Sequence, residues 1–312
     1  PDFFTVIERL LLYFKDQMKE FLSNYEIFNI FKSNKRLLLK LFEEKIITPD
    51  QPIASTLSNG KFPQQYYLNY FYPEFKSLLS EKLVQEIEME NCRFTEDREP
   101  IVYTSSSFEQ KRKIGENDDA ICQIIQNDSI DEFTSFIKKN NFNLSSKIKP
   151  SVYETNSFLL SKTPTLIEYS AFYNSVQIFN FLHSRNVDLT SSLWIFAIYG
   201  QSLEIIDFLR KHNVSPKDKS YKECLIKSIE CHHLEITNYL LTNFFKGKPV
   251  DALNINQELF KSYNFFYFPN EIIADFNTFY DLCQSDYSSL VQKILVKANI
   301  NVNSRRISNL MI

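Results

Sequence analysis

The chain has 312 residues, of which 44% are apolar and 15% aromatic, so it carries enough apolar surface to fold. Its formal net charge of -3 gives no general attraction to phosphate backbones or anionic membranes, so we expect no nucleic-acid and no membrane partner. No apolar run approaches the roughly 20 residues that span a bilayer. The 5 cysteines form no CxxC motif, which favours a reducing compartment and a cytoplasmic location.

Residues 1–117 form a predicted N-terminal helical region with repeat-like helices. A degenerate copy of the repeat described below occupies Ile30, Asn34, Leu37, Leu38, Leu41, Phe42 and Ile47. The aromatic cluster that ends at Pro73 is predicted to pack at a helix junction rather than to form a docking patch, and it consists of Tyr66, Tyr67, Tyr70, Phe71 and Tyr72. The same packing is predicted for a second cluster that ends at Pro269, which consists of Phe265, Phe266, Tyr267 and Phe268. The basic run Lys111-Arg112-Lys113 is predicted to be a solvated helix face, because Glu109 and Glu116 flank it.

Residues 118–244 contain a repeat. The segment Leu166 to Leu189 recurs 27 residues later and again after a further 31. The first copy is Leu166, Ile167, Ser170, Gln177, Ile178, Phe181, Leu182 and Val187, and the second is Leu193, Trp194, Ala197, Glu204, Ile205, Phe208, Leu209 and Val214. The third is Cys224, Leu225, Ser228, Glu235, Ile236, Tyr239 and Leu240. Units of this size cannot bury their own apolar face and must stack on neighbours.

Each copy has two helical halves, separated in the first copy by Tyr173, Asn174 and Ser175. The second half ends at Arg185-Asn186 or His212-Asn213, where Asn can take the left-handed conformation that closes a helix. A weaker copy precedes these at an offset of 45, followed by an insertion at about 145–162. We predict an eroded repeat or helical linker at 245–276 and a further repeat at 277–312, with an offset of 113 from the first copy. In this alignment three cysteines lie on buried helix faces: Cys122, Cys224 and Cys283.

The repeat resembles the ankyrin repeat. The segment from Thr165 to Ala171 is similar to that family's T-P-L-H-x-A-A opening, and His233-Leu234-Glu235-Ile236 matches its H-x-E-I segment. Asn186-Val187-Asp188 resembles the closing G-A-D, with Asn in place of Gly. The resemblance implies an all-α solenoid of stacked helix-turn-helix units with a concave binding face.

Longer phrases resemble a large, uncharacterised ankyrin-containing family of single-celled parasitic eukaryotes. These phrases are Tyr25 to Lys35, Lys111 to Asp118, and Pro164 to Tyr169. The resemblance spans nearly the whole chain and implies an N-terminal helical region that leads into ankyrin units. It implies no reaction.

The sequence offers little for catalysis. Cys224, Cys231, His232 and His233 make a poor zinc site, because adjacent helical side chains point about 100° apart. His183 and His212 are predicted in the last turn of second helices, where imidazoles stabilise the helix end. The chain contains no GxSxG, HExxH, P-loop or GxGxxG motif, so we expect no enzyme, no cofactor and no metal.

Positions that the apolar template leaves free are the predicted partner-binding residues. They are Asp188, Thr190 and Ser191 at one tip, Lys217, Asp218 and Lys219 at the next, and Phe172, Tyr199 and Glu230 on the first helices. We expect a monomeric, non-catalytic scaffold that binds a protein partner of unknown identity through the concave face. The alternative is a structural or self-associating solenoid segment of a larger protein, and an enzyme is a distant third.

Overall fold

A computed structural model describes residues 3–58, 65–93, 101–247, 253, 255–267 and 276–297. Within these residues the regular elements are helices, as the sequence predicts, and one isolated antiparallel bridge joins Lys147 to Thr165. None of the helices in the described ranges is long and apolar enough to cross a membrane. The chain divides into a first unit, Pro1–Ile124 with Ser146–Thr165, and a second unit, Ile125–Ser145 with Leu166–Ile312. The predicted insertion therefore belongs to the N-terminal part of the protein.

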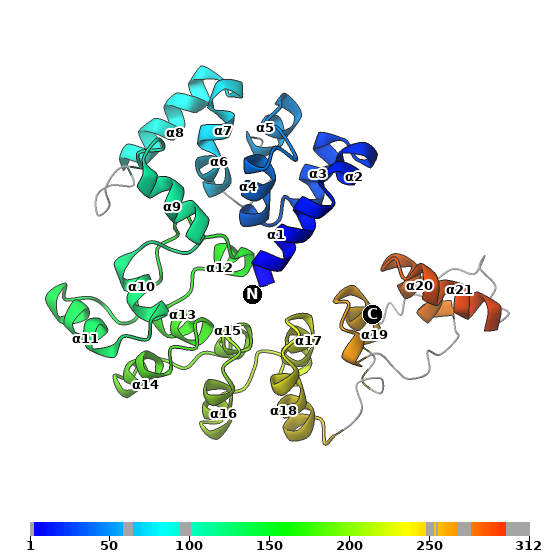
Figure 1. Ribbon diagram of the computed structural model, residues 1–312. Coiled ribbons are helices and arrows are strands. Elements are labelled where there is room, and N and C mark those ends of the chain that lie inside the picture. The colour runs from blue at the N-terminus through cyan, green and yellow to red at the C-terminus, as the bar shows by residue number, and fades with distance from the viewer. Residues whose placement is uncertain are drawn as a thin grey trace. The chain divides into compact units, whose positions relative to one another are not determined.

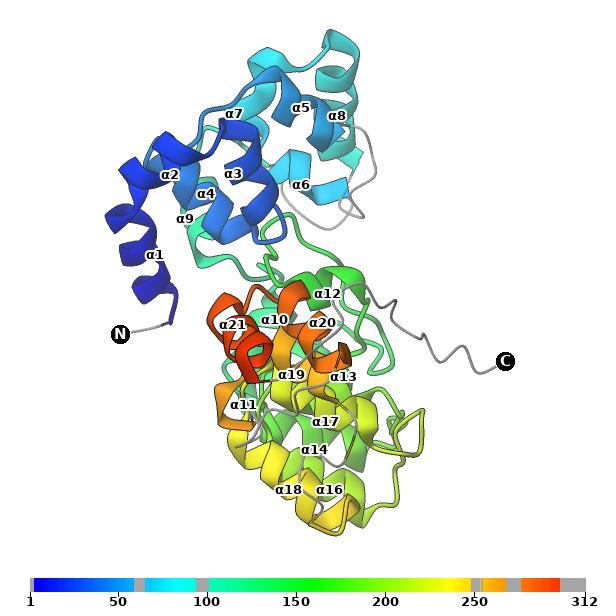
Figure 2. The same cartoon turned by 90° about the vertical axis from the view of Figure 1, so that its right-hand side faces the viewer.

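The first unit contains α1 (Phe3–Tyr13), α2 (Lys15–Phe21), α3 (Asn24–Phe31), α4 (Lys35–Glu43), α5 (Gln51–Ser58), α6 (Gln65–Tyr70), α7 (Tyr72–Phe75), η1 (Lys76–Leu78), α8 (Glu81–Arg93), α9 (Ser106–Ile114) and α12 (Ser157–Ser161). Its caps follow from the sequence. Ser23 and Glu26 form a capping box at the start of α3, and the Asn34 side chain accepts a hydrogen bond from the Leu37 N–H at the start of α4. The helices α3, α4, α5, α6 and α7 pack against one another (Figures 1 and 2), and their buried apolar side chains contribute to the core of this unit.

The aromatic cluster of the first unit is buried, which confirms the packing prediction. Tyr67, Tyr70, Phe71 and Tyr72 all lie in the core, while the side chain of Tyr66 is outside the described residues. Four positions of the predicted degenerate repeat, Leu38, Leu41, Phe42 and Ile47, are buried.

Two expectations for the first unit were wrong. Ile30 is exposed, because α3 buries the face that carries Ile27 and Phe28 and Ile30 lies off that face. The basic run at 111–113 is not a solvated face throughout, because Arg112 is buried. Its Nη1 lies 2.9 Å from both carboxylate oxygens of Glu74, and this ion pair compensates for burial of the charge.

The second unit is a series of helical hairpins. It contains α11 (Ile130–Lys139), α13 (Leu166–Phe172), α14 (Val176–Ser184), α15 (Leu193–Tyr199), α16 (Leu203–Lys211), α17 (Lys222–Glu230), α18 (Leu234–Phe244), α19 (Asn256–Lys261), η4 (Phe265–Tyr267), α20 (Phe276–Gln284) and α21 (Ser288–Lys297), and α10 (Ala120–Gln126) crosses the division. The first helices contact one another in sequence, α13 with α15, α15 with α17 and α17 with α19, and each of α13, α15 and α17 packs on its own second helix. Figure 1 shows α14, α16 and α18 along one side of this row.

Apolar positions of the repeat template form the core of these hairpins. Leu166, Leu193 and Cys224 occupy one template position and are fully buried, and so are Ile178, Ile205 and Ile236 at another. The chain is left-handed at Asn186 (φ 59°) and Asn213 (φ 56°), as predicted from their place after the second helices. A second left-handed position recurs with the same offsets between the paired helices, at Asn174, Gln201 and His232.

The C-terminal copy is in a different register from the expected one. Cys283 is exposed, although Cys122 and Cys224 are buried as predicted. The left-handed residue of this copy is Asp286, at an offset of 112 from Asn174 rather than 113. Buried Leu282 therefore takes the position expected for Cys283. The end of this copy, including 300, 302 and 308, lies outside the described residues.

The aromatic segment at 265–268 is not fully packed. Phe266 is 69% exposed, which corrects the prediction that this cluster is buried. It lies in η4, a single short turn, where Tyr267 is held by a hydrogen bond from its OH to Asn238 Oδ1 at 3.2 Å. The side chains of Phe265 and Phe268 are outside the described residues.

Candidate binding surface

Three of the predicted binding residues occupy one position of the repeat. Phe172, Tyr199 and Glu230 are the last residues of α13, α15 and α17. The rings of Phe172 and Tyr199 lie 5.9 Å apart, and the Lys227 ammonium lies 5.6 Å from the Tyr199 ring. Lys227 also pairs with Glu230, with 2.5 Å between Nζ and Oε2. We call Phe172, Tyr199, Lys227 and Glu230 the first-helix row.

Close backbone contact sets the spacing of this row. A Cβ on Gly200 would lie 2.3 Å from the carbonyl oxygen of Ala171 and 2.6 Å from that of Phe172. Only glycine allows the end of α15 to approach the end of α13 in this way. The same approach brings the rings of Phe172 and Tyr199 together.

The first-helix row carries one ion pair, between Lys227 and Glu230. Partial burial raises the pKa of Tyr199, so this phenol is protonated at neutral pH. Partial burial lowers the pKa of Lys227, but the hydrogen bond to Glu230 and the nearby Tyr199 outweigh it, and the net shift is upward. Lys227 is therefore a cation between an aromatic ring and a carboxylate.

Sequence reasoning missed Lys227. It lies 31 residues after Phe196, and the corresponding residue of the first copy is Tyr169. Two repeats thus have an aromatic residue where the third has a lysine. This break in the pattern was the signal that could have identified it.

The residues at the first tip, Asp188, Thr190 and Ser191, are exposed. The Thr190 hydroxyl donates to Glu168 Oε1 at 3.4 Å, and Ser192 donates to the same oxygen at 2.5 Å. Thr190 is therefore hydrogen-bonded to a residue of α13, and the sequence did not predict this contact.

The second tip is exposed too, but one of its residues has a local structural role. Asp218 accepts hydrogen bonds from the Ser220 hydroxyl and, at 3.5 Å, from the Glu223 N–H at the start of α17. Burial raises the pKa of Asp218, but these bonds together lower it further, so the carboxylate is charged. Lys217 and Lys219 are exposed and carry the positive charge of this tip.

Two histidines of the second unit, His232 and His233, bond to backbone groups, and burial keeps the thiols of Cys224 and Cys231 protonated. Burial lowers the pKa of His233, against a hydrogen bond to the backbone of Tyr199, and His232 Nε2 lies 3.0 Å from the Ser262 carbonyl. Burial raises the pKa of Cys224 to about 12 and that of Cys231 to about 11, so neither thiol is a thiolate at neutral pH. Across the described residues no group of three or more His, Cys, Asp or Glu is placed to hold a metal.

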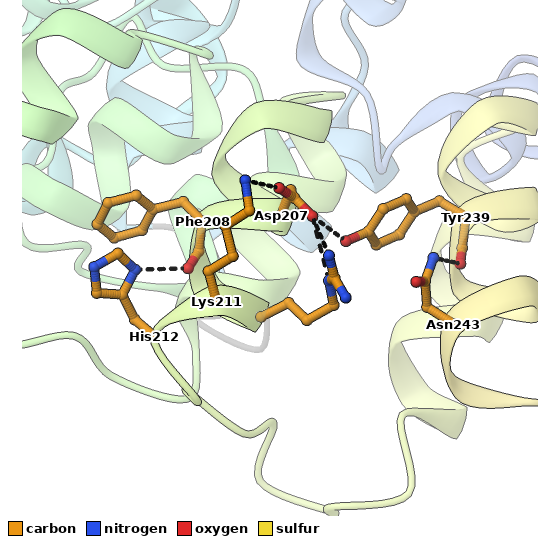
Figure 3. A network of polar contacts seen from close by, with 7 residues as sticks. Asp207, Phe208, Lys211, His212, Tyr239 and Asn243 are labelled. Atoms are coloured by element: carbon orange, nitrogen blue, oxygen red, sulfur yellow. Dashed lines mark hydrogen bonds and ion pairs between the residues drawn. The ribbon is translucent and has the colours of Figure 1, made fainter.

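A polar network joins two second helices (Figure 3). Asp207 on α16 accepts from Lys211 at 2.7 Å, from Arg210 at 2.9 Å and from the Tyr239 hydroxyl of α18 at 2.7 Å. Hydrogen bonds from Lys211, Tyr239 and Arg210 hold the pKa of Asp207 well below its usual range. Beside this network the Phe208 ring stacks on His212, which follows the end of α16, at 3.9 Å. The network links neighbouring hairpins.

No family model, curated protein or solved structure matches this chain.

Proposed function

We propose that the chain is a non-catalytic scaffold of ankyrin type that binds a protein partner through the first-helix row. The observation that carries the proposal is the alignment of Phe172, Tyr199 and Glu230 at one repeat position, with half-exposed aromatic rings beside an ion pair. Aromatic side chains with a polar edge dominate protein interfaces because they bury large areas with little loss of conformational freedom.

Support for the ankyrin type comes from local features. The first helices contact one another in series, the closing positions Asn186 and Asn213 are left-handed, and His233 bonds to the backbone of the preceding repeat at Tyr199. Solenoids of this kind present long surfaces for partners.

The test is affinity capture from extracts of cells that contain the protein. The double variant Phe172→Ala/Tyr199→Ala removes the rings of the row, and Phe208→Ala/Tyr239→Ala removes the same pair of residue types from second helices, where they are equally half-buried. The first variant is expected to lower partner recovery about tenfold or more, since hot-spot residues contribute about 2 kcal/mol or more each. Equal loss from both variants would place binding elsewhere.

Self-association is the second candidate, and one observation favours it. Tyr13 and Phe21, at the ends of α1 and α2, are each 75% exposed, and Leu10 on α1 is also exposed. Exposed apolar residues grouped on neighbouring helices mark contact surfaces. Sedimentation velocity of the full chain distinguishes the two candidates. The scaffold is expected to sediment as a monomer, whereas a self-associating chain is expected to form a dimer through α1 that the variant Tyr13→Ser dissociates.

A further inference from the structure

The segment 146–165, which we call the strap, belongs to the first unit although it is separated in sequence from the rest of that unit. It follows α11 and precedes α13 in sequence, yet its contacts are with the first unit. Ile148, Val152, Tyr153 and Leu159 are its buried apolar residues, and Val152 joins the core cluster of the first unit. The strap therefore completes a core that is built mainly from residues before position 90.

A buried lysine holds the strap. The Lys35 side chain is 0% exposed, and its ammonium donates to the main-chain carbonyls of Glu154 at 2.9 Å and of Val152 at 3.3 Å. The rings of Tyr67 and Tyr70 lie 5.2 and 5.1 Å from the same nitrogen. Moving an ammonium out of water is costly unless hydrogen bonds and nearby charge compensate, so Lys35 depends on the strap for its compensation.

The strap brings a second buried charge to the same place. Glu154 is 5% exposed, and its Oε1 accepts the Asn156 N–H at 2.7 Å. Among the residues that the structure describes, its Oε2 is buried with no hydrogen-bond partner. Burial raises the pKa of Glu154 to about 7 and lowers that of Lys35 to about 7. The other charged or titratable groups described around this site are Glu116, Arg36, Tyr67, Tyr70 and, beyond Tyr70, Arg112 with Glu74 and Glu43.

Short hydrogen-bonded links fix the strap on both sides of Lys35. Thr155 donates to the Gly115 carbonyl from its N–H at 3.0 Å and from its hydroxyl at 2.8 Å. Asn117 Nδ2 donates to the Lys149 carbonyl at 2.9 Å, and the Ser151 hydroxyl donates to Asp118 Oδ1 at 2.8 Å. Two of these four bonds involve the strap backbone and two involve its side chains, so all four break when the strap lifts.

We propose that the strap is a latch of the first unit, which opens as one segment while the helices beneath it stay folded, and which Lys35 holds shut. The closed latch buries a lysine and a half-satisfied carboxyl side by side, and opening returns both to water. Closing the strap removes two charged groups from water, and opening recovers that cost of desolvation. Such a segment therefore opens at lower free energy than the apolar core. Opening would uncover Tyr67, Tyr70 and the Lys35 ammonium. On this surface the ammonium can donate hydrogen bonds to the carbonyls of another extended chain.

Native-state hydrogen exchange of the full chain, followed by mass spectrometry at increasing denaturant, tests the latch. In the wild type, the N–H of Thr155, which donates to the Gly115 carbonyl outside the strap, is expected to exchange at least tenfold faster than those of Leu38 and Phe71 in the core, through a separate opening. Exchange of strap and core in one common step would overturn the proposal, and this measurement needs no variant.

The variant Lys35→Met tests the part played by the ammonium. It keeps the length of the side chain and removes the donor to the two strap carbonyls, so strap exchange is expected to rise a further tenfold with core exchange unchanged. Lys113→Met is the matched control, because that lysine is 64% exposed and lies outside the strap contacts described above. Wild-type protection of the strap in Lys35→Met, or an equal loss over strap and core, would contradict the assigned role of Lys35.

Discussion

The Cβ that Gly200 lacks would lie 2.3 Å from the carbonyl oxygen of Ala171, so α13 and α15 meet through bare backbone at the centre of the first-helix row. The variant Gly200→Ala distinguishes this contact from a simple backbone effect. Gly200 has φ -74°, a conformation that alanine adopts freely, and reduced freedom of the unfolded chain alone would stabilise the variant by about 0.4–1 kcal/mol. The clash predicts the opposite sign, a loss of about 1–3 kcal/mol.

Trp194, the single tryptophan, lies in α15, so its fluorescence follows unfolding of the second unit in urea. A variant Gly200→Ala as stable as the wild type would show that α13 and α15 can move apart at no cost in free energy. The close backbone contact at Gly200 would then not set the spacing of the first-helix row.

The left-handed closing positions predict the effect of substituting Asn186. Its φ is 59° and its side chain is exposed, so the variant Asn186→Ala removes no buried contact. Alanine in this conformation costs about 1–2 kcal/mol, whereas Asn186→Gly relieves the strain. The same urea titration should therefore rank glycine above alanine. Equal stability of the two variants would mean that the chain at 186 rearranges.

The ion pair of Arg112 and Glu74 predicts a large loss in the first unit. The variant Arg112→Met leaves the partly buried Glu74 carboxyl without its cation and the Tyr70 carbonyl without the Nη1 donor at 3.0 Å. Removing one partner of a buried pair costs about 3–5 kcal/mol. Exposed Lys113→Met next to it should change stability by less than about 0.5 kcal/mol. Urea unfolding followed by circular dichroism measures both, and similar small effects would show that Arg112 is solvated.

The strap site predicts a dependence of stability on pH. Folding lowers the pKa of Lys35 from 10.5 to about 7, so the unfolded chain binds this proton more tightly than the folded one. The stability that Lys35 contributes is therefore smallest below pH 7 and rises between pH 7 and 10, by on the order of 1 kcal/mol per pH unit. Comparing Glu154→Gln with Lys35→Met/Glu154→Gln isolates this proton, because neither variant has the Glu154 carboxyl. A difference in unfolding free energy that stays constant from pH 7 to 10 would contradict it.

The second tip predicts a charge effect on partner capture. Lys217 and Lys219 are exposed, and Asp218 between them is engaged at the start of α17. The double reversal Lys217→Glu/Lys219→Glu should weaken capture several-fold without lowering the stability of the second unit. Lys138→Glu/Lys139→Glu, exposed at the end of α11, is the matched control. Undiminished capture by the tip variant would remove the tip from the binding surface.

The repeat could be predicted because several of its apolar template positions are buried in each of the three copies. Leu166, Leu193 and Cys224 share one environment, so apolar residues recur there with the offsets of the sequence. The same offsets place Phe172, Tyr199 and Glu230 at one position. The register at Cys283 could not be predicted, since one residue more or less in a connection moves a cysteine from the buried face to the exposed one.

Charged residues in the core could not be predicted from local pattern. Lys35 contacts the carbonyl of a residue 119 positions away, and Arg112 contacts Tyr70 at 42 positions. Sequence reasoning treats lysine and arginine as solvated because they are rarely buried. Such pairs are identified only when the fold brings their partners together.

Photo-crosslinking in cell extract tests the central claim, that the first-helix row is the binding surface. A photoreactive phenylalanine analogue replaces Phe172 or Tyr199 in one set of proteins and Phe208 or Tyr239 in the other, and each protein is irradiated and its adducts are resolved by mass. The row predicts one common adduct from Phe172 and Tyr199 that is absent from the second-helix positions. A common adduct from Phe208 and Tyr239, with none from Phe172 and Tyr199, would contradict the account.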